Sequence, residues 1–297
     1  MNTIVKIQTH PTCPTELSEE QIRLYHQHGF LAFENVLSPE EVERARESVS
    51  RLIHHAYQNY PRVPGYFGGS FHYQKPDGAF HVQTEPEAPT SFDTPLDLEY
   101  KVRKIANYIE EDAFLHYTCM EHPRLRGVLE SLVGKNPIHF QNMGLLKPPF
   151  GGIEKPWHQD NAYFSVAPLE AVIGVWLALD EAKADNGCMH VIPGAHLEGA
   201  RIHVHDRDCE IEAEKLATEK AVAIELKPGG ALFFYGMLPH MTPVNQSAER
   251  RRALQYHYRA TSSQIVDKEA YDRVFAEADG TPASCAMNRK PGRMGEQ

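Results

Sequence analysis

The sequence predicts a mainly β protein with flanking helices, whose core is a jelly roll of the cupin-like kind. From residue 137 onward, short apolar or alternating runs are separated by Gly, Pro and Asp-Asn-Gly. Repeated short strands with such turns are typical of a barrel or sandwich of antiparallel strands. Before residue 137, helix-start signals dominate. The strand-like runs are IHFQNMGLLKPP, AVIGVWLALDEA, CMHVIPGAH, AVAIELKPGGALFFYG and RALQYHYRA.

Two helices are predicted at the ends of residues 18–57. SEEQ, starting at Ser18, and SPEE, starting at Ser38, have the pattern of a capping box, in which a serine and a Gln or Glu three residues later bond each other's backbone N–H. After Ser38, apolar residues recur at spacings of three and four, which gives the second helix one apolar face. GFLAFENVL between the helices predicts a strand, and residues 97–133 predict further helix.

Residues 60–95 are rich in Pro, Gly and aromatic side chains, which excludes a regular helix. Long irregular loops often cover binding sites, and an ordinary surface loop is the alternative interpretation. We expect this segment and residues 200–220 to contribute substrate contacts. The candidate side chains are Tyr66, Phe67, Phe71, His72 and Tyr73.

The 297 residues contain no internal repeat and no low-complexity linker, so we expect a single domain over residues 1–297. In this prediction a helical N-terminal part, about residues 18–133, precedes the jelly-roll core, about residues 137–262. A C-terminal tail follows over residues 263–297.

Composition excludes some classes of partner. The net charge is −10 and the pI about 5.9, and an acidic surface repels nucleic acid and anionic lipid alike. No apolar run approaches the ~20 residues of a membrane span, and the N-terminus lacks the apolar core of a secretory signal. The scattered cysteines are typical of free thiols in a reducing compartment, so the cytoplasm is the expected location. The cysteines are Cys13, Cys119, Cys188, Cys209 and Cys285.

The stretch KPWHQDNAYF places His158 and Asp160 two residues apart. In an extended segment, side chains i and i+2 project on one face, so the two could be neighbouring metal ligands while Gln159 points elsewhere. A polar turn is the alternative for the tripeptide alone. His240, in YGMLPHMTPVN, follows an apolar strand and could supply a third ligand. Two imidazoles and one carboxylate leave positions open, as suits Fe(II) that must also bind a cosubstrate and O2.

Two other kinds of protein could use the same three ligands, namely a non-catalytic metal-binding jelly-roll sensor and a zinc-dependent cupin-type hydrolase or isomerase. Arg251, eleven residues after His240, argues against both, because an arginine in the cavity can bind a dicarboxylate through paired N–H bonds. We expect Arg251 to begin a strand beside the one that carries His240. Alternation should direct Arg250 and Arg252 away from the cavity into solvent.

Four blocks of sequence, in order, resemble the phytanoyl-CoA dioxygenase family of Fe(II)/2-oxoglutarate oxygenases. The likeness covers roughly residues 18–260 and implies a double-stranded β-helix, in agreement with the strand pattern. The blocks are YHQHGFLAFENVLSPEEVERAR, KPPFGGIEKPWHQDNAYF, DNGCMHVIPGAH and PHMTPVNQSAERRRALQYH.

The resemblance implies roles for particular residues. His158, Asp160 and His240 match the family's iron ligands, and Arg251 matches its cosubstrate arginine. HVHD at residues 203–206 matches none of the metal residues, and we expect it to be a loop. The further cosubstrate contacts that the resemblance implies are Lys104, Met143, Gln159, Trp176 and Thr242.

Some of these contacts have a plainer interpretation. Trp176 could be an ordinary core residue, and Met143 could fill a gap in packing. Alternation along the chain points the side chain of Gln159 away from the metal.

The implied activity is that of a dioxygenase that binds Fe(II), 2-oxoglutarate and O2 and hydroxylates or otherwise oxidises a small organic metabolite, with release of succinate and CO2. Related halogenases lack the carboxylate ligand, so Asp160 favours hydroxylation, desaturation or ring closure over halogenation. Members of the family act on acyl-CoA thioesters, amino acids and secondary metabolites. The acidic composition argues against a polyanionic CoA ester.

Overall fold

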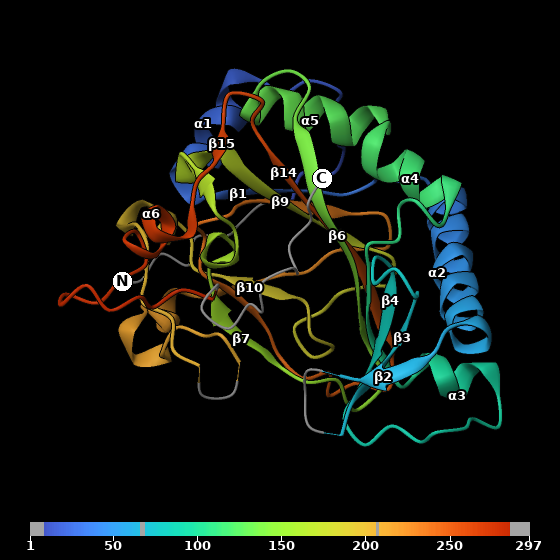
Figure 1. The fold of residues 1–297 in the computed structure, drawn as a ribbon. Coiled ribbons are helices and arrows are strands. Elements are labelled where there is room, and N and C mark those ends of the chain that lie inside the picture. Colours follow the sequence, from blue (N-terminus) through green and yellow to red (C-terminus); the bar gives the residue numbers. More distant parts are fainter. Residues whose placement is uncertain (1–8, 66–68, 206–207, 286–297) are drawn as a thin grey trace.

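The computed structural model describes residues 9–65, 69–205 and 208–285 and contains two facing antiparallel sheets (Figure 1). The larger sheet has nine strands, which are, in sheet order, β1 (Phe30–Phe33), β12 (Ala231–Tyr235), β9 (Val172–Ala178), β14 (Arg251–Arg259), β6 (Ile138–Lys147), β5 (Val102–Ala106), β4 (His81–Thr84), β3 (Phe71–Gln74) and β2 (Arg62–Pro64). The smaller sheet consists of β11 (Val222–Ile224), β10 (Met189–Val191), β13 (His240–Thr242) and β7 (Lys155–His158). This arrangement is the jelly roll predicted from the short strands.

Helices and short turns complete the chain. The α-helices are α1 (Glu19–His28), α2 (Pro39–Asn59), α3 (Pro95–Glu99), α4 (Ala113–Met120), α5 (Pro123–Val133) and α6 (Lys268–Asp272). The 3-10 helices are η1 (Asp160–Tyr163), η2 (Leu169–Ala171), η3 (Ala195–Glu198), η4 (Ala213–Lys215) and η5 (Thr218–Lys220). A third, two-stranded sheet pairs β8 (Val166–Ala167) with β15 (Gln264–Ile265).

Alternation along the strands of the larger sheet separates two cores. On β14, Leu254, Tyr256 and Tyr258 pack on the outer face against the apolar side of α2, which contributes Val49 and Ile53. Figure 1 shows α2, α4 and α5 on this outer side. On the inner face, Trp176, Ala253 and Phe234 pack with residues of β10 and β11, so the second core joins the two sheets. The space between the sheets therefore holds the side chains that the inner faces present.

The N-terminal predictions are confirmed in detail. Ser18 and Gln21 form a capping box at α1, and Ser38 and Glu41 form one at α2. The segment between these helices is β1, which pairs with β12 at the edge of the larger sheet. The N-terminal helices thereby lead directly into the jelly roll.

The predictions for residues 60–133 are partly wrong. The segment expected to be an irregular loop contains β2, β3 and β4, and the segment expected to be helical contains β5 as well as α3, α4 and α5. These four strands extend the larger sheet beyond β6 in antiparallel order. Short strands interrupted by Pro and Gly carry little periodicity, which is why the sequence pattern missed them.

The prediction of free thiols is wrong for two cysteines. Cys209 and Cys285 form a disulfide, while Cys13, Cys119 and Cys188 are free and buried. Cysteines 76 positions apart show no pairing pattern in sequence, and the fold brings them together because backbone bonds hold the C-terminal segment on η1.

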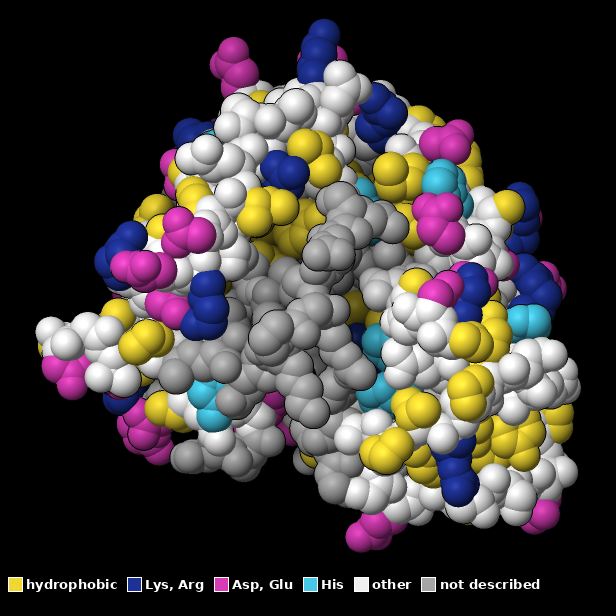
Figure 2. All heavy atoms as spheres, in the orientation of Figure 1, with side chains coloured by type: hydrophobic (Ala, Val, Ile, Leu, Met, Phe, Trp, Pro, Cys, Tyr) yellow, Lys and Arg dark blue, Asp and Glu magenta, His cyan; other side chains and the backbone are white. Residues whose placement is uncertain are grey.

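The described helices and one face of the molecule bear on the predicted partners. None of the helices in the described part of the chain has the length and apolar character that a bilayer requires. On the face shown in Figure 2, acidic and basic side chains are interspersed.

Candidate metal centre

His158 and His240 lie opposite each other on neighbouring strands of the smaller sheet. His158 is the last residue of β7, His240 is the first of β13, and the two are direct antiparallel partners. Their ring centroids are 4.1 Å apart, and both side chains are buried. The predicted third ligand from a neighbouring strand therefore lies beside the first pair.

Asp160 lies beside the two histidines, as predicted, but it is not part of a strand. The strand ends at His158, and Asp160 begins η1. Gln159 between them keeps extended backbone angles, φ −109° and ψ 129°, so the side chains on either side of it still project to one face.

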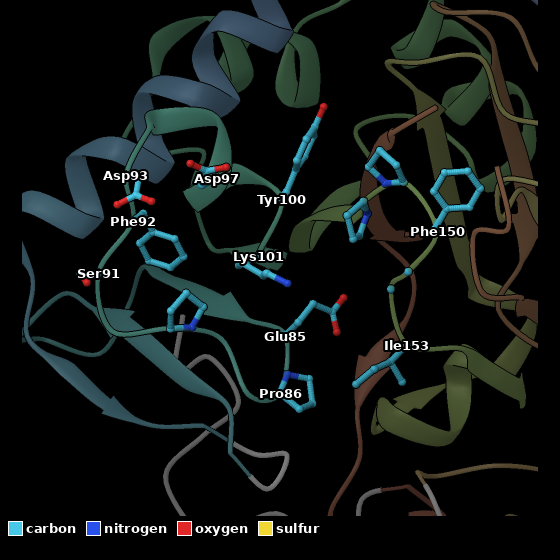
Figure 3. Close-up of a pocket in the computed structure, with 15 residues that line it drawn as sticks. Glu85, Pro86, Ser91, Phe92, Asp93, Asp97, Tyr100, Lys101, Phe150 and Ile153 are labelled. Atoms are coloured by element: carbon cyan, nitrogen blue, oxygen red, sulfur yellow. The ribbon is translucent and has the colours of Figure 1, made fainter. Parts of the chain in front are cut away.

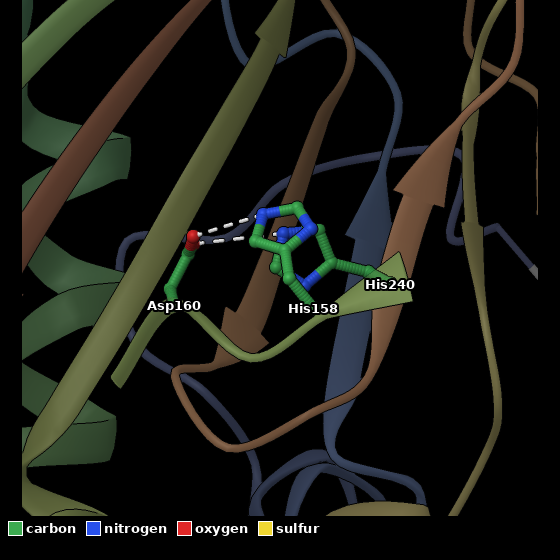
Figure 4. A group of neighbouring side chains, drawn as sticks. All are labelled: His158, Asp160 and His240. Carbon is green, nitrogen blue, oxygen red and sulfur yellow. Dashed lines mark ion pairs between the residues drawn. The ribbon is translucent and has the colours of Figure 1, made fainter. Parts of the chain in front are cut away.

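The three side chains converge on one point between the sheets (Figure 4). The Nε2 of His158 is 3.4 Å from Oδ1 of Asp160, and the Nε2 of His240 is 3.7 Å from Oδ2. One ligand atom from each residue lies within 4.8 Å of the others. Donors bound at ~2 Å to a common ion lie up to ~4 Å apart, so the separations of 3.4 and 3.7 Å fit a single metal ion.

Backbone carbonyls fix the tautomers of both histidines. The Nδ1 of His158 is 2.8 Å from the carbonyl oxygen of Pro156, and the Nδ1 of His240 is 2.9 Å from that of Leu238. A carbonyl oxygen only accepts, so each Nδ1 carries the hydrogen and each Nε2 presents a lone pair toward Asp160. Burial and the neighbouring His158 lower the pKa of His240 to about 3, which keeps this imidazole neutral.

Asp160 is buried among donors that favour its charged form. Burial alone would raise its pKa, but the neighbouring imidazoles of His257, His240 and His158 hold that pKa well below its usual range. His257, on β14, approaches within 2.7 Å of Oδ2. Sequence reasoning missed His257, although alternation from Arg251 along QYHY would have placed it on the inner face.

Gln159 is held by the backbone on the far side from the metal centre. Its amide nitrogen donates to the carbonyls of Gly199 and Met237, and its oxygen accepts from the N–H of Arg201. Both N–H bonds of the amide are thus used, which leaves no donor for a cosubstrate. The backbone N–H of Gln159 donates to Nε2 of His203, which lies outside the helices and named strands, as predicted, and braces the ligand segment. Asp206, the last residue of HVHD, lies outside the described residues.

Arg251 begins β14, with its side chain on the inner face. It is 1% exposed, its Nη1 donates to the carbonyl of Leu145, and its Nε has no partner. Its guanidinium lies 5.4 Å from the ring of Trp176, within cation–π range. Burial lowers the pKa of Arg251 to about 10. No carboxylate among the described residues forms an ion pair with this cation, so its environment fits an incoming anionic group.

The strand that carries Arg251 is not the neighbour that we expected. β14 lies between β9 and β6 in the larger sheet, whereas His240 is on β13 in the smaller sheet. Arg250 and Arg252 do point away from Arg251, but they are not solvated. Arg250 pairs with Glu99, and Arg252 makes a two-point ion pair with Asp180.

Trp176 and Met143 both lie on the inner face, on strands that flank β14. Trp176, on β9, is fully buried in the inner core, and its Nε1 has no partner. Met143, on β6, is the cross-strand partner of Gln255 and is half-buried. Both side chains therefore face the space between the two sheets, and Trp176 is at the same time a core residue.

Lys104 and Thr242 are the two remaining residues predicted to contact the cosubstrate. Lys104, on β5, is the cross-strand partner of Leu145, and burial together with the nearby Arg103 lowers its pKa to about 8, against the raising effect of Asp160. Thr242 is two residues after His240 on β13, so its side chain shares that face.

The predicted substrate contacts are only partly on the inner face. Phe71 and Tyr73 pack in the outer core beneath α2, whereas His72 between them points to the opposite face. Tyr66 and Phe67 lie outside the described residues. Alternation along β3 explains the split.

A separate hollow of about 850 Å³ opens beside the segment that leads from β6 to β7 (Figure 3). Phe92 and Asp93 lie on one wall and Phe150 on the other, with Glu85 and Lys101 between them. None of the residues assigned to the metal centre or to the cosubstrate lines this hollow.

Comparison with known proteins gives consistent results. The phytanoyl-CoA dioxygenase (PhyH) family model matches residues 25–253. The phytanoyl-CoA dioxygenase domain-containing protein 1 of Danio rerio is 26% identical over 280 residues, covering 85% of this chain and 94% of the relative.

Two solved structures share the fold. EctD from S. alaskensis with bound Fe has a TM-score of 0.65 at 19% identity, covering 88% of this chain and 86% of that one. EvdO2 from Micromonospora carbonacea var. aurantiaca, complexed with 2-oxoglutarate, has a TM-score of 0.60 at 22% identity, covering 85% and 94%.

Proposed function

Since the chain belongs to the phytanoyl-CoA dioxygenase family, we propose that His158, Asp160 and His240 hold its catalytic iron. The protein is an Fe(II)- and 2-oxoglutarate-dependent dioxygenase that oxidises a small organic molecule with release of succinate and CO2. The observation that carries the assignment of ligands is the convergence of two neutral imidazoles and one buried carboxylate within 4.8 Å.

When bound, Fe(II), 2-oxoglutarate and O2 supply the oxidising chemistry, and the chain supplies position and exclusion of water. The carbonyls of Pro156 and Leu238 aim the two imidazoles, and burial of all three ligands limits the access of solvent. Three protein ligands leave coordination positions for the cosubstrate and oxygen.

We assign Arg251 to the cosubstrate site because its guanidinium has no ion-pair partner among the described residues. A buried guanidinium with a free Nε is stabilised by a carboxylate that accepts two N–H bonds, such as the distal carboxylate of 2-oxoglutarate. Thr242 adds a hydroxyl, Trp176 and Met143 line the cavity, and Lys104 adds positive charge near Asp160. Gln159 is left out of this set, because its amide is bound to the backbone.

The substrate is proposed to be a small metabolite with polar groups. Across β3, β4 and β5, the residues His72, Gln83 and Lys104 form a row of cross-strand partners on the inner face. Gln83 is 3% exposed, and its amide nitrogen has no hydrogen-bond partner. Buried polar groups are normally satisfied, so this amide favours a substrate that brings an acceptor.

Neither alternative function gains an observation in its favour. A sensor or a zinc-dependent hydrolase would leave the buried Arg251 without a role. The net charge of −10 and the mixed surface favour neither nucleic acid nor a membrane as a partner. We retain one domain, because β2–β5 share a sheet with β6. The disulfide between Cys209 and Cys285 weakens the argument for a reducing compartment, so the proposed cytoplasmic location now rests on the three buried free thiols.

The assignment is tested by succinate release in the presence of Fe(II), 2-oxoglutarate and a panel of polar metabolites. The wild-type protein should form succinate only when Fe(II) is present, and Asp160→Ala should fall to the level of the protein-free control, because it removes the only anionic ligand. Asp185→Ala, which removes an exposed carboxylate, is the matched control. Unimpaired succinate release by Asp160→Ala would remove this carboxylate from the metal centre.

A further inference from the structure

Two side chains on β14 contact the carboxylate of Asp160 from the larger sheet, opposite the histidine ligands. We propose that His257, assisted by Gln255, is a positioning residue that fixes which oxygen of Asp160 faces the metal. This inference rests on the proposed function of the centre. In this proposal, the larger sheet supplies hydrogen bonds that orient the carboxylate ligand, while the smaller sheet supplies the two histidine ligands.

Both contacts are made with the same oxygen of Asp160. Nε2 of His257 is 2.7 Å from Oδ2 of Asp160, and the amide nitrogen of Gln255 is 3.4 Å from the same oxygen. Oδ1 is the atom that lies 3.4 Å from Nε2 of His158. Because a carboxylate oxygen only accepts, His257 donates through Nε2–H, and both donors of β14 are bound to one oxygen.

His257 is outside the group of atoms that could share the ion. The ligand atoms that lie within 4.8 Å of one another belong to His158, Asp160 and His240 alone among the described residues. Its Nε2 is occupied by the bond to Asp160. A histidine that donates to a ligating carboxylate is an outer partner of the site, comparable to the carboxylates that orient ligating histidines.

The imidazole of His257 is held firmly enough to act as a fixed reference. It is fully buried and surrounded by aromatic rings, with centroid distances of 4.9 Å to Phe164, 6.1 Å to Phe140 and 6.3 Å to Phe234. Its strand is paired on both sides, with β6 and β9. Side chain and backbone are therefore both constrained.

The chemical consequence concerns the symmetry of a carboxylate. Its two oxygens are equivalent until something distinguishes them, and a free carboxylate can turn or bind a metal through both atoms. Because two donors bind Oδ2, its lone pairs are used by hydrogen bonds. Oδ1, which lies on the side of His158, is then the oxygen that is available to the metal. Loss of this support should weaken metal binding without removing a ligand.

The experiment is an anaerobic calorimetric titration of Fe(II) into the metal-free full-length protein. His257→Phe keeps the ring and the aromatic packing but removes the N–H, and it should weaken the Fe(II) Kd by ~10–100-fold. His257→Gln places an amide N–H near the position of Nε2 and should restore most of the affinity. Gln255→Leu should weaken binding less than His257→Phe, because its contact is the longer one.

Tyr256→Phe is the matched control. It lies on the same strand but on the outer face, where its hydroxyl is 2.9 Å from that of Thr118, so it should leave the Fe(II) Kd unchanged. The absorption spectrum of bound Co(II) gives a second readout, which should change in His257→Phe and return in His257→Gln.

The outcomes distinguish a failure of the positioning role of His257 from a failure of the proposed iron site. Wild-type affinity in His257→Phe would overturn the positioning role, whereas a wild-type protein that binds no Fe(II) would overturn the proposed function itself. If His257→Phe does not fold, the other two variants decide: Gln255→Leu at wild-type affinity, or His257→Gln with no Fe(II) binding despite a native melting curve, contradicts the role.

Discussion

Arg251 shows, at the scale of one residue, how burial points to a ligand. An arginine that is 1% exposed has lost most of its hydration, and its bond to the carbonyl of Leu145 replaces only part of it. Removing a charge from water is costly unless a counter-charge is present. Arg252, next in sequence, meets that requirement with Asp180, and Arg251 does not.

Replacement of this guanidinium should act mainly on the cosubstrate. Arg251→Met should raise the KM for 2-oxoglutarate by ~10–150-fold, which corresponds to a charge-assisted bond of about 1.5–3 kcal/mol. It should not destabilise the cosubstrate-free protein strongly, because it removes a cation without an ion-pair partner. Steady-state kinetics and thermal melts of the same preparation measure both effects.

Two further variants sharpen this test. Arg251→Lys keeps the charge but not the paired N–H geometry, so its KM should lie between those of the wild type and Arg251→Met. Arg250→Met removes a guanidinium that pairs with Glu99 outside the cavity and should leave the KM unchanged. An unaltered KM in Arg251→Met would exclude Arg251 from the cosubstrate site.

Site residues could be predicted where neighbours in space are also close in sequence. His158 and Asp160 are two apart in sequence, so a local rule brings them together. His257 contacts the same carboxylate from 97 residues away, and no spacing rule reports that contact. Gln159 shows the converse, since alternation predicted its direction correctly although it stands between two ligands.

At the scale of elements, capping boxes were easier to predict than short strands. Each box joins neighbouring residues, and those at Ser18 and Ser38 formed as their sequence indicates. β5 has five residues in a segment that looked helical, and it exists because β4 and β6 supply its hydrogen bonds. Tertiary pairing of this kind overrides local preference.

The C-terminal segment is a second element that local rules could not place. The N–H of Cys285 donates to the carbonyl of Ala162 in η1, and the N–H of His203 donates to the carbonyl of Ala283. The disulfide between Cys209 and Cys285 therefore connects two segments that both contact the ligand-bearing part of the chain.

Loss of this disulfide should lower stability while the metal ligands stay in place. Cys285→Ser should reduce the free energy of unfolding by about 2–4 kcal/mol, because the cross-link limits the unfolded chain. Urea unfolding with and without a reductant measures the effect. The wild type should lose the same amount on reduction, and Cys285→Ser should not respond; a reductant-insensitive wild type would contradict the expectation.

At the scale of the whole molecule, the centre depends on two sheets that face each other. The smaller sheet carries His158 and His240, while the larger sheet carries Arg251, Trp176 and His257 on its inner face. Helices α2, α4 and α5 cover the outer face of the larger sheet and contribute none of these side chains. The strand pattern predicted the jelly roll, but it did not predict which strands belong to which sheet, because sheet membership depends on long-range pairing.

The central claim is that three side chains, distant along the chain, bind one ferrous ion. The most direct test compares the stoichiometry of Fe(II) bound under anaerobic conditions by the wild type and by His240→Ala, because His240 is the ligand contributed from the far strand. The account predicts one equivalent of Fe(II) for the wild type and a large loss of affinity for the variant. Equal binding of Fe(II) by both proteins would show that the ion is held elsewhere.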